Sequence, residues 1–343
     1  MPALDVFTGD AFSAKELTDA INTVPNQFGR INELNLFPDR GIRTTSVMVE
    51  EQNGVLHLLA TAERGAPGTA GVKPKRKART FANLHVPHDT QIKADDVQNL
   101  REFGSDNELA GVENRVNEEL VSHRVKHDIT REHLRAGALR GDIIDADGST
   151  LLNLFTEFGI AQTAVDFVLG TAGTNVRTKA MAVRRAVELA LKGEVMTGVH
   201  ALCSPSFFDA LVSHASVERA WDNHQGNSDR LSNDPRSGFS FGGITWEEYL
   251  GEATTLNEDG TTTLRKFVPD GDARVFPVGT RQSFWTYNAP GDFVEAVNTM
   301  GLPVYAKQSP DSKFNRWVDI HSQQNPLPLC LRPAVLVRAH SSN

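Results

Sequence analysis

Two apolar-patterned runs with a polar segment between them stand out within residues 43–97. The runs cover residues 45–62 and 80–92, and the segment 63–79 contains three glycines and two prolines, which exclude a helix there. The Asn53-Gly54 pair, flanked by apolar residues, is a strong hairpin signal. The pattern predicts a small hairpin whose outgoing strand runs to a flexible tip. Because two isolated strands are only marginally stable in water, we expect another subunit to cover this arm.

The strongest helical pattern follows this stretch. Apolar residues recur mostly every three or four positions from Leu109 to Leu134, without a proline. Ser105 is a suitable N-cap with Glu108 three residues later, and glycines at 137 and 141 are suitable ends. The pattern predicts a helix over about 105–137, and a helix of about 30 residues spans roughly 45 Å. Such a helix is expected to be the spine of an elongated or flat subunit.

The rest of the pattern mixes short helices, strands and turns, which predicts the α+β class. Helices are expected over 14–22, from the Thr174/Asn175 cap to Gly193, from Ser204-Pro205 to about 214, and over 292–300. Turns and strands are expected around Asp147-Gly148, over 151–158, over 199–202, through an antiparallel region at 242–278, and in a proline-rich edge followed by a buried strand at 325–339.

Residues 1–42 form an arm-like segment with one short helix. Four phenylalanines (Phe7, Phe12, Phe28 and Phe37) are spread along it, and the segment is too short to bury them alone. Two interpretations stay open. The arm packs on the body of its own chain, or it lies over a neighbouring subunit.

Composition supports a folded protein and limits its partners. The chain has 343 residues, a length that suits two domains, and 39% hydrophobic with 23% charged residues is enough for a packed core. The formal net charge of −8 argues against a protein that coats itself with nucleic acid. Two cysteines support neither a zinc site nor a disulfide framework. Neither a transmembrane helix nor a signal peptide is indicated, and no cofactor is expected.

Two pairs of residues carry the candidate chemistry. His123 and His127 lie four apart on the predicted long helix, a spacing that metal sites use. The flanking cations would oppose a metal ion, so a solvated or interface face is the favoured interpretation. Cys203 lies three residues after His200, but no third group is evident that would orient the histidine as a base. A buried structural thiol is favoured for Cys203, and no catalytic or metal-ligating residue is predicted.

The segment between the two apolar runs ends in a cluster of cations, which is the one strong charge feature of the sequence. The cluster consists of Lys73, Lys75, Arg76, Lys77 and Arg79. A solvated loop and a nucleic-acid patch are both conceivable, but aromatic residues are not interleaved with the cations and the chain is acidic overall. Contact with an acidic surface of a second copy satisfies both observations.

Several short segments, in order along essentially the whole chain, resemble the major capsid proteins of tailed bacteriophages, specifically the lambda-type major capsid protein E family. The segments are FP at 37–38, RTTSV at 43–47, VKPK at 72–75, VPH at 86–88, DGDARVFP at 270–277, YNAP at 287–290, GLP at 301–303 and QNPLP at 324–328. No single segment is diagnostic; the resemblance depends on their number and order.

The resemblance implies the capsid-shell fold that tailed phages share with herpesviruses. It implies an N-terminal arm (1–42), an extended loop (43–98), a peripheral domain (99–193 and 301–343) built on the spine helix, and an axial domain (194–300). It also implies that Lys73, Lys75 and Lys77 sit at the extended-loop tip, against an adjacent subunit.

The function implied by the resemblance is self-assembly of pentamers and hexamers into an icosahedral shell that encloses double-stranded DNA. The implied partners are further copies of the chain, a scaffolding protein, a portal protein and often a decoration protein. The implied location is the virion, with assembly in the host cytoplasm. Three alternatives stay open: an encapsulin-like cargo compartment with the same fold, a metal- or thiol-dependent enzyme, and a nucleic-acid-binding module that works through the basic tip.

Overall fold

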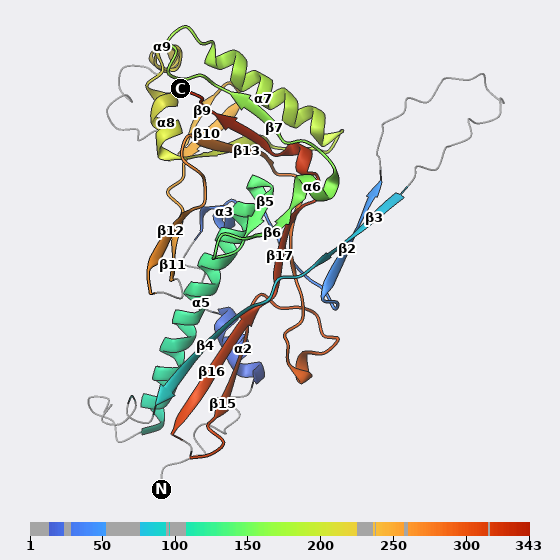
Figure 1. The fold of residues 1–343 in the computed structure, drawn as a ribbon, viewed down its shortest axis with the longest axis vertical. Coiled ribbons are helices and arrows are strands. Elements are labelled where there is room, and N and C mark those ends of the chain that lie inside the picture. Colours follow the sequence, from blue (N-terminus) through green and yellow to red (C-terminus); the bar gives the residue numbers. More distant parts are fainter. Residues whose placement is uncertain are drawn as a thin grey trace, which may run out of the picture. The chain divides into compact units, whose positions relative to one another are not determined.

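The chain divides into two compact units, each assembled from three separate stretches. The computed structural model describes residues 14–23, 29–52, 76–93, 96, 108–224, 236, 238–256, 260–314 and 316–343 (Figure 1). Unit 1 comprises Met1–Val47, Phe81–Glu132 and Trp285–Pro328. Unit 2 comprises Met48–Thr80, His133–Phe284 and Leu329–Asn343. Helices and sheets occur in both units, which confirms the predicted α+β class.

Unit 1 contains a three-stranded antiparallel sheet in the order β15-β16-β4. Its helices and strands, some of which extend into unit 2, are α2 (Ala14–Thr23), α3 (Arg30–Glu33), β1 (Asp39–Gly41), β4 (Val86–Lys93), α5 (Glu108–Arg140), β14 (Phe284–Asn288), η3 (Val294–Ala296), β15 (Tyr305–Pro310), β16 (Trp317–Gln324) and β17 (Pro326–Cys330). Strands β1, β14 and β17 form a second sheet.

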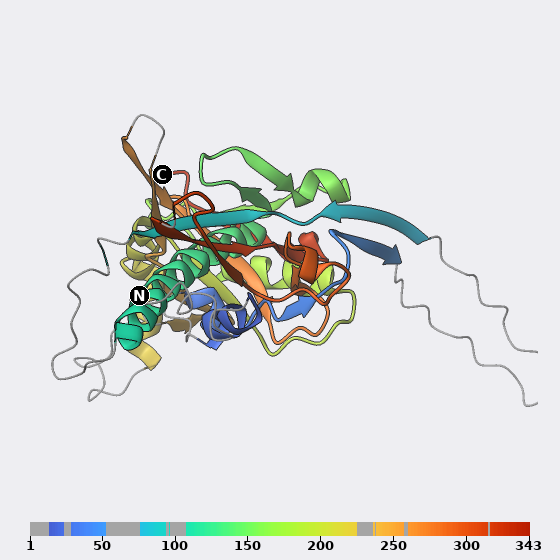
Figure 2. The same ribbon diagram turned by 90° about the horizontal axis from the view of Figure 1, so that it is seen from below.

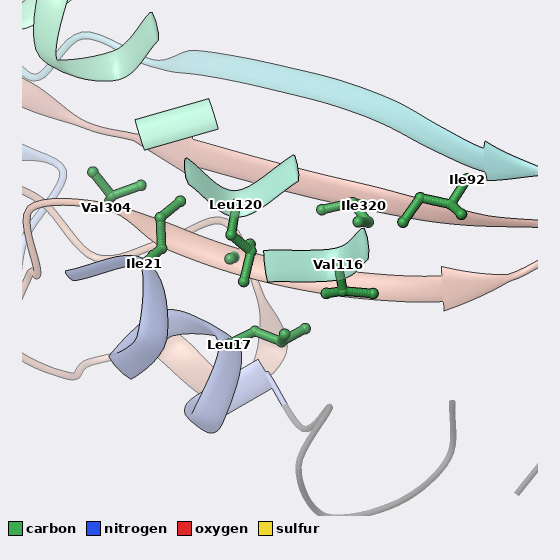
Figure 3. Packing of buried hydrophobic residues seen from close by; sticks show 8 residues of the cluster. Leu17, Ile21, Ile92, Val116, Leu120, Val304 and Ile320 are labelled. Carbon is green, nitrogen blue, oxygen red and sulfur yellow. The ribbon is translucent and has the colours of Figure 1, made fainter. Parts of the chain in front are cut away.

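The hydrophobic core of unit 1 lies where α2 and α5 pack on the β15-β16-β4 sheet (Figure 3). It is made of Leu17 and Ile21 from α2, Val116 and Leu120 from α5, Ile92 from β4, Val304 and Ala306 at β15, and Ile320 from β16. Val116 and Leu120 lie one turn apart on α5, so the helix presents a single apolar face to the sheet.

Helix α2 settles the interpretation of its part of the arm. The Thr18 hydroxyl donates to the carbonyl oxygen of Ala306 at 3.1 Å and accepts from the amide of Ala306 at 3.1 Å. Asn22 donates to the carbonyl oxygen of Val304 at 2.8 Å. The helix therefore packs on its own unit. Phe37 is also buried, whereas Phe7, Phe12 and Phe28 fall outside the described residues.

Helix α5 confirms the predicted long helix, with a shift at its C-terminal end. The predicted N-cap, Ser105, lies outside the described residues, and the helix runs past Gly137 to Arg140. Gly137 lies inside the helix, and the close approach of strand β5 (Asp142–Ile144) favours a glycine there, since a Cβ would stand only 3.0 Å from the Cα of Ile143. The helix ends at Gly141, whose φ of +83° is a conformation that favours glycine.

Unit 2 is built on a six-stranded mixed sheet in the order β7-β18-β13-β8-β10-β9. These strands are β7 (Thr163–Asp166), β8 (Gly198–Cys203), β9 (Phe239–Phe241), β10 (Ile244–Glu248), β13 (Asp272–Val278) and β18 (Val337–His340). The other helices and strands are β5 (Asp142–Ile144), β6 (Thr150–Asn153), α6 (Leu154–Phe158), α7 (Val176–Leu191), α8 (Pro205–Val212), α9 (Ala215–His224), β11 (Glu252–Leu256), β12 (Thr262–Lys266) and η4 (Pro333–Val335).

Two helix starts in unit 2 are confirmed in detail. The Asn175 side chain accepts from the amide of Thr178 at 3.1 Å and begins α7, which ends at Lys192 and Gly193 in left-handed conformations. The Ser204 side chain caps α8, with Pro205 in its first turn. The hairpin at Asp147-Gly148 is confirmed as the β5–β6 pair.

Three expectations about secondary structure are wrong in whole or in part. Residues 292–300 form only the short 3-10 helix η3 rather than an α-helix, because the residues on either side of it leave the helical conformation, Phe293 with ψ 146° and Val297 with ψ 127°. The second half of the strand predicted over 151–158 is α6, which Asn153 caps. The region 242–278 is not purely antiparallel, since β10 pairs in parallel with β8.

Candidate functional site

The extended-loop stretch forms a two-stranded ribbon of β2 (Ser46–Gln52) and β3 (Arg76–Ala82) (Figures 1 and 2). The Asn53-Gly54 turn and the rest of 53–75 lie outside the described residues. Strand β3 begins at Arg76, inside the segment predicted to be the polar tip. The returning run predicted over 80–92 is divided, because residues 86–93 form β4 and pair with β16 instead.

The ribbon has little support from other strands. Within the described part of the chain, β2 and β3 pair only with each other. Met48 is 66% exposed on β2, whereas its neighbour Val47 and Phe81 on β3 are buried. Strand edges without a partner are templates for pairing with another chain. The ribbon therefore offers backbone and apolar surface that a neighbouring molecule could cover.

Of the five predicted contact cations, the structure describes the side chain of Arg79. Lys73 and Lys75 fall outside the described residues, and Arg76 and Lys77 are the first two residues of β3. Arg79 contacts its own chain within unit 2. Its Nε donates to the carbonyl oxygen of Glu157 at 2.8 Å, and its guanidinium lies 4.8 Å from the centre of the Phe158 ring. Nothing in the sequence distinguishes Arg79 from the other four.

The histidine pair on α5 is buried, which corrects the expectation of a solvated or interface face. His123 and His127 are 0% and 2% exposed. His123 Nδ1 lies 2.7 Å and His127 Nε2 lies 2.8 Å from the same Ser322 hydroxyl on β16. Burial lowers the pKa of His123 to about 4 and that of His127 to about 3, so both are neutral at pH 7.

The sequence holds a signal for this burial. Continuing the three-to-four spacing of Val116 and Leu120 along α5 reaches His123 and His127, not the neighbouring Val125. The cations that flank the pair in sequence lie on the other faces of the helix register and do not predict the burial of the histidines. Among the residues that the structure describes, no group of three or more His, Cys, Asp or Glu side chains is arranged to hold a metal ion.

Cys203 is a buried thiol, as predicted. It lies at the end of β8 and is fully buried, and burial raises its pKa well above the ordinary value. His200 directs Nε2 to the Glu247 carboxylate at 2.9 Å instead of to a thiol. Cys330 is buried in the same way, with a raised pKa. Neither thiol has the lowered pKa that marks a nucleophilic cysteine.

The described helices include none with both the length and the apolar character needed to span a bilayer. This finding concerns helices only, and only those between residues 14 and 343 that the structure describes.

The fold of the chain is similar to the folds of solved phage capsid proteins. A crystal structure described as a prophage capsid protein from E. coli CFT073 matches with a TM-score of 0.59 and 13% identity, covering 96% of this chain and 99% of that one. The capsid structure of cyanophage P-SCSP1u matches with a TM-score of 0.51 and 10% identity, covering 94% of this chain and 90% of that one. These likenesses confirm the predicted shell fold.

The sequence defines the family. The family model described as phage major capsid protein E matches residues 13–341. The major capsid protein of Pseudomonas phage KPP10 is 30% identical, over 96% of this chain and 97% of its own length. The chain belongs to the phage major capsid protein E family. The resemblance seen in the short segments is thereby confirmed.

Proposed function

We propose that this chain self-assembles, as pentamers and hexamers, into an icosahedral shell that encloses double-stranded DNA in the virion. Membership in the capsid protein family over nearly the whole chain is the observation that carries the proposal. The role is structural rather than catalytic. The buried neutral histidines and the buried thiols of raised pKa are consistent with this role.

The ribbon of β2 and β3 supplies the contact between subunits. The described part of the chain covers neither the unpaired strand edges of the ribbon nor the exposed Met48 side chain, so we expect a neighbouring subunit to cover them. The cations Lys73, Lys75, Arg76 and Lys77 dock on an acidic surface of the adjacent copy, which the net charge of −8 makes available. Arg79 anchors the base of the ribbon to its own chain.

The domain assignment stays part of this proposal. Residues 1–42 form the arm, 43–98 the extended loop, 99–193 with 301–343 the peripheral domain, and 194–300 the axial domain. The two compact units divide the chain at other positions, so the assignment describes roles in the shell rather than separate folding units. A scaffolding protein, a portal protein and a decoration protein complete the assembly in the host cytoplasm.

The tip is tested by the triple variant Lys75→Glu/Arg76→Glu/Lys77→Glu, expressed together with the neighbouring genes of its genome. Wild-type protein is expected to sediment as closed particles, and the variant as folded, unassembled subunits. A control carries Arg177→Glu, Arg185→Glu and Arg219→Glu on exposed positions of α7 and α9, which gives the same change in net charge. Normal particles from the tip variant would exclude the tip as an assembly contact.

What the particles contain distinguishes a DNA-enclosing shell from an encapsulin-like cargo compartment, and a binding assay tests the nucleic-acid-binding module. Nuclease-protected double-stranded DNA is expected inside particles that form with the portal and packaging proteins. Particles that hold protein cargo and no DNA would support the encapsulin-like alternative. Salt-sensitive DNA binding by the isolated subunit that the tip variant abolishes would support the nucleic-acid-binding module.

A further inference from the structure

A chain of hydrogen bonds joins α5 to the sheet in unit 1. The Ser322 hydroxyl on β16 is a hydrogen-bond partner of both His123 Nδ1 and His127 Nε2. His123 Nε2 lies 2.8 Å from the Thr90 hydroxyl on β4. The Ser322 hydroxyl also lies 3.3 Å from the carbonyl oxygen of His88 on β4. Two neighbouring strands and one helix are thus connected through two imidazoles.

The neutral histidines satisfy this network. When both imidazole N–H groups donate to the Ser322 oxygen, the Ser322 O–H is left to donate to the His88 carbonyl, and the Thr90 O–H to His123 Nε2. Each of these four hydrogens then has an acceptor. Protonation of His123 places a second N–H opposite the Thr90 hydroxyl and introduces a positive charge into a site without exposure to solvent.

The surrounding charges oppose a proton on either ring. His88 lies with its ring centre 4.5 Å from that of His123, and the Lys126 ammonium lies 2.9 Å from His88 Nε2. The other charged or titratable groups that face the pair are Arg124 paired with Asp128, Arg131 paired with Asp39, Glu119 near His88, and Asp89 paired with His321 on β16. Asp128 and Asp39 are paired with arginines, and the one carboxylate that favours a proton on His123, Asp89, is outweighed by burial and by the charges of the neighbouring groups.

The position of His123 and His127 on α5 links their protonation to the packing of the helix on the sheet. His123 lies three residues after Leu120, on the same face of α5, so the hydrogen-bonded pair continues the contact that Val116 and Leu120 make with the sheet. We propose that His123 and His127 form an acid-sensitive joint, which holds α5 on β4 and β16 while both imidazoles are neutral and releases it when they are protonated.

The direction of the pH effect on stability follows from the difference in histidine pKa between the folded and the open state. A histidine whose pKa in the folded state lies below 6.5 takes up a proton more readily in the open or unfolded state. The stability it contributes is present above pH 6.5 and is lost as the pH falls toward the folded-state pKa, about 4 for His123 and about 3 for His127. Between neutral pH and pH 5 the opening equilibrium constant therefore rises by about 30-fold for each histidine.

Hydrogen–deuterium exchange read by mass spectrometry tests the joint, at pH 7.5 and pH 5 with correction for intrinsic exchange. In the wild type, peptides covering 115–131 and 318–324 are expected to open at least about 30-fold more at pH 5. The double variant His123→Asn/His127→Gln places an amide nitrogen near each bonded ring nitrogen but does not titrate, so its protection is expected to be the same at both pH values. His214→Asn in unit 2, whose Nδ1 faces Ser216 at 2.8 Å, is the control and should behave as the wild type.

A second measurement needs no variant. Exchange of the imidazole C2 hydrogen in the wild type gives the pKa of each histidine, and both His123 and His127 are expected to titrate below pH 5. Titration of both near 6.5 would overturn the proposal. Equal loss of protection at pH 5 in the wild type and in the double variant would overturn it as well. Both readouts apply to the free subunit and to particles, so neither depends on shell formation.

Discussion

The Thr18 hydroxyl fastens α2 to the edge of the unit 1 sheet, and Thr18→Val removes this bond without changing the size or branching of the side chain. Thr18 is 6% exposed, and its hydroxyl is the partner of both the N–H and the C=O of Ala306. The variant buries a methyl group in place of the hydroxyl and leaves two backbone groups without this partner. We expect α2 to loosen from β15 while the rest of unit 1 stays folded.

The size of the stability loss is set by the two backbone groups of Ala306 that lose their hydrogen-bond partner. A buried polar group that loses its partner costs about 1–3 kcal/mol. Two groups give at least about 2 kcal/mol, and 2 kcal/mol corresponds to roughly a 30-fold change in an opening equilibrium. Thr23→Val is the matched control on the same helix, because the Thr23 hydroxyl donates only to the Asp19 carbonyl in an exposed position. The control is expected to change stability by less than about 0.5 kcal/mol.

Amide exchange of the peptide that contains Val304, Ala306 and Lys307 measures the effect directly. In Thr18→Val the Ala306 amide is expected to exchange at least about 30-fold faster than in the wild type, and in Thr23→Val at nearly the wild-type rate. Equal exchange in the two variants would refute the intramolecular packing of α2. It would revive the interpretation in which the arm lies over a neighbouring subunit.

Three other experiments test unit 2. Asn175→Ala removes the α7 cap and is expected to lower the free energy of unfolding by about 1 kcal/mol in urea titrations of the free subunit; an unchanged midpoint would contradict the cap. Gly141→Ala places a Cβ against the Phe155 ring at φ +83°, and should destabilise more than Gly159→Ala, where φ is +64° and no atom lies within 4 Å; equal losses would remove the steric part of the argument. Cys203 and Cys330 should resist iodoacetamide at pH 8 in the native protein and react after denaturation, so rapid native labelling would contradict their raised pKa.

The local chemistry of the chain predicted much of its secondary structure. Asn175 and Ser204 begin their helices as side-chain caps, and glycines 141 and 193 follow the ends of theirs. These helix starts and ends depend on a few neighbouring residues, so a short stretch of sequence is enough to predict them. The buried Cys203 was predictable for the same reason, because it ends a short apolar strand.

Features set by distant parts of the chain were not predictable from local patterns. Strand β4 leaves the ribbon because β16, more than 200 residues later, offers a partner along its whole length. Arg79 points to its own chain because the carbonyl of Glu157 lies within reach. The histidine pair illustrates a different case: its register along α5 was visible, but only the sheet opposite it shows that the register continues the core.

Cryo-electron microscopy of particles, formed by the chain expressed with its neighbouring genes, tests whether this chain builds a closed shell through contacts of its extended loop. We expect an icosahedral shell with copies at fivefold and sixfold positions, in which residues 53–77 of each copy lie against an adjacent copy. Subunits that stay monomeric under all conditions, or a shell in which this segment contacts only its own chain, would contradict it.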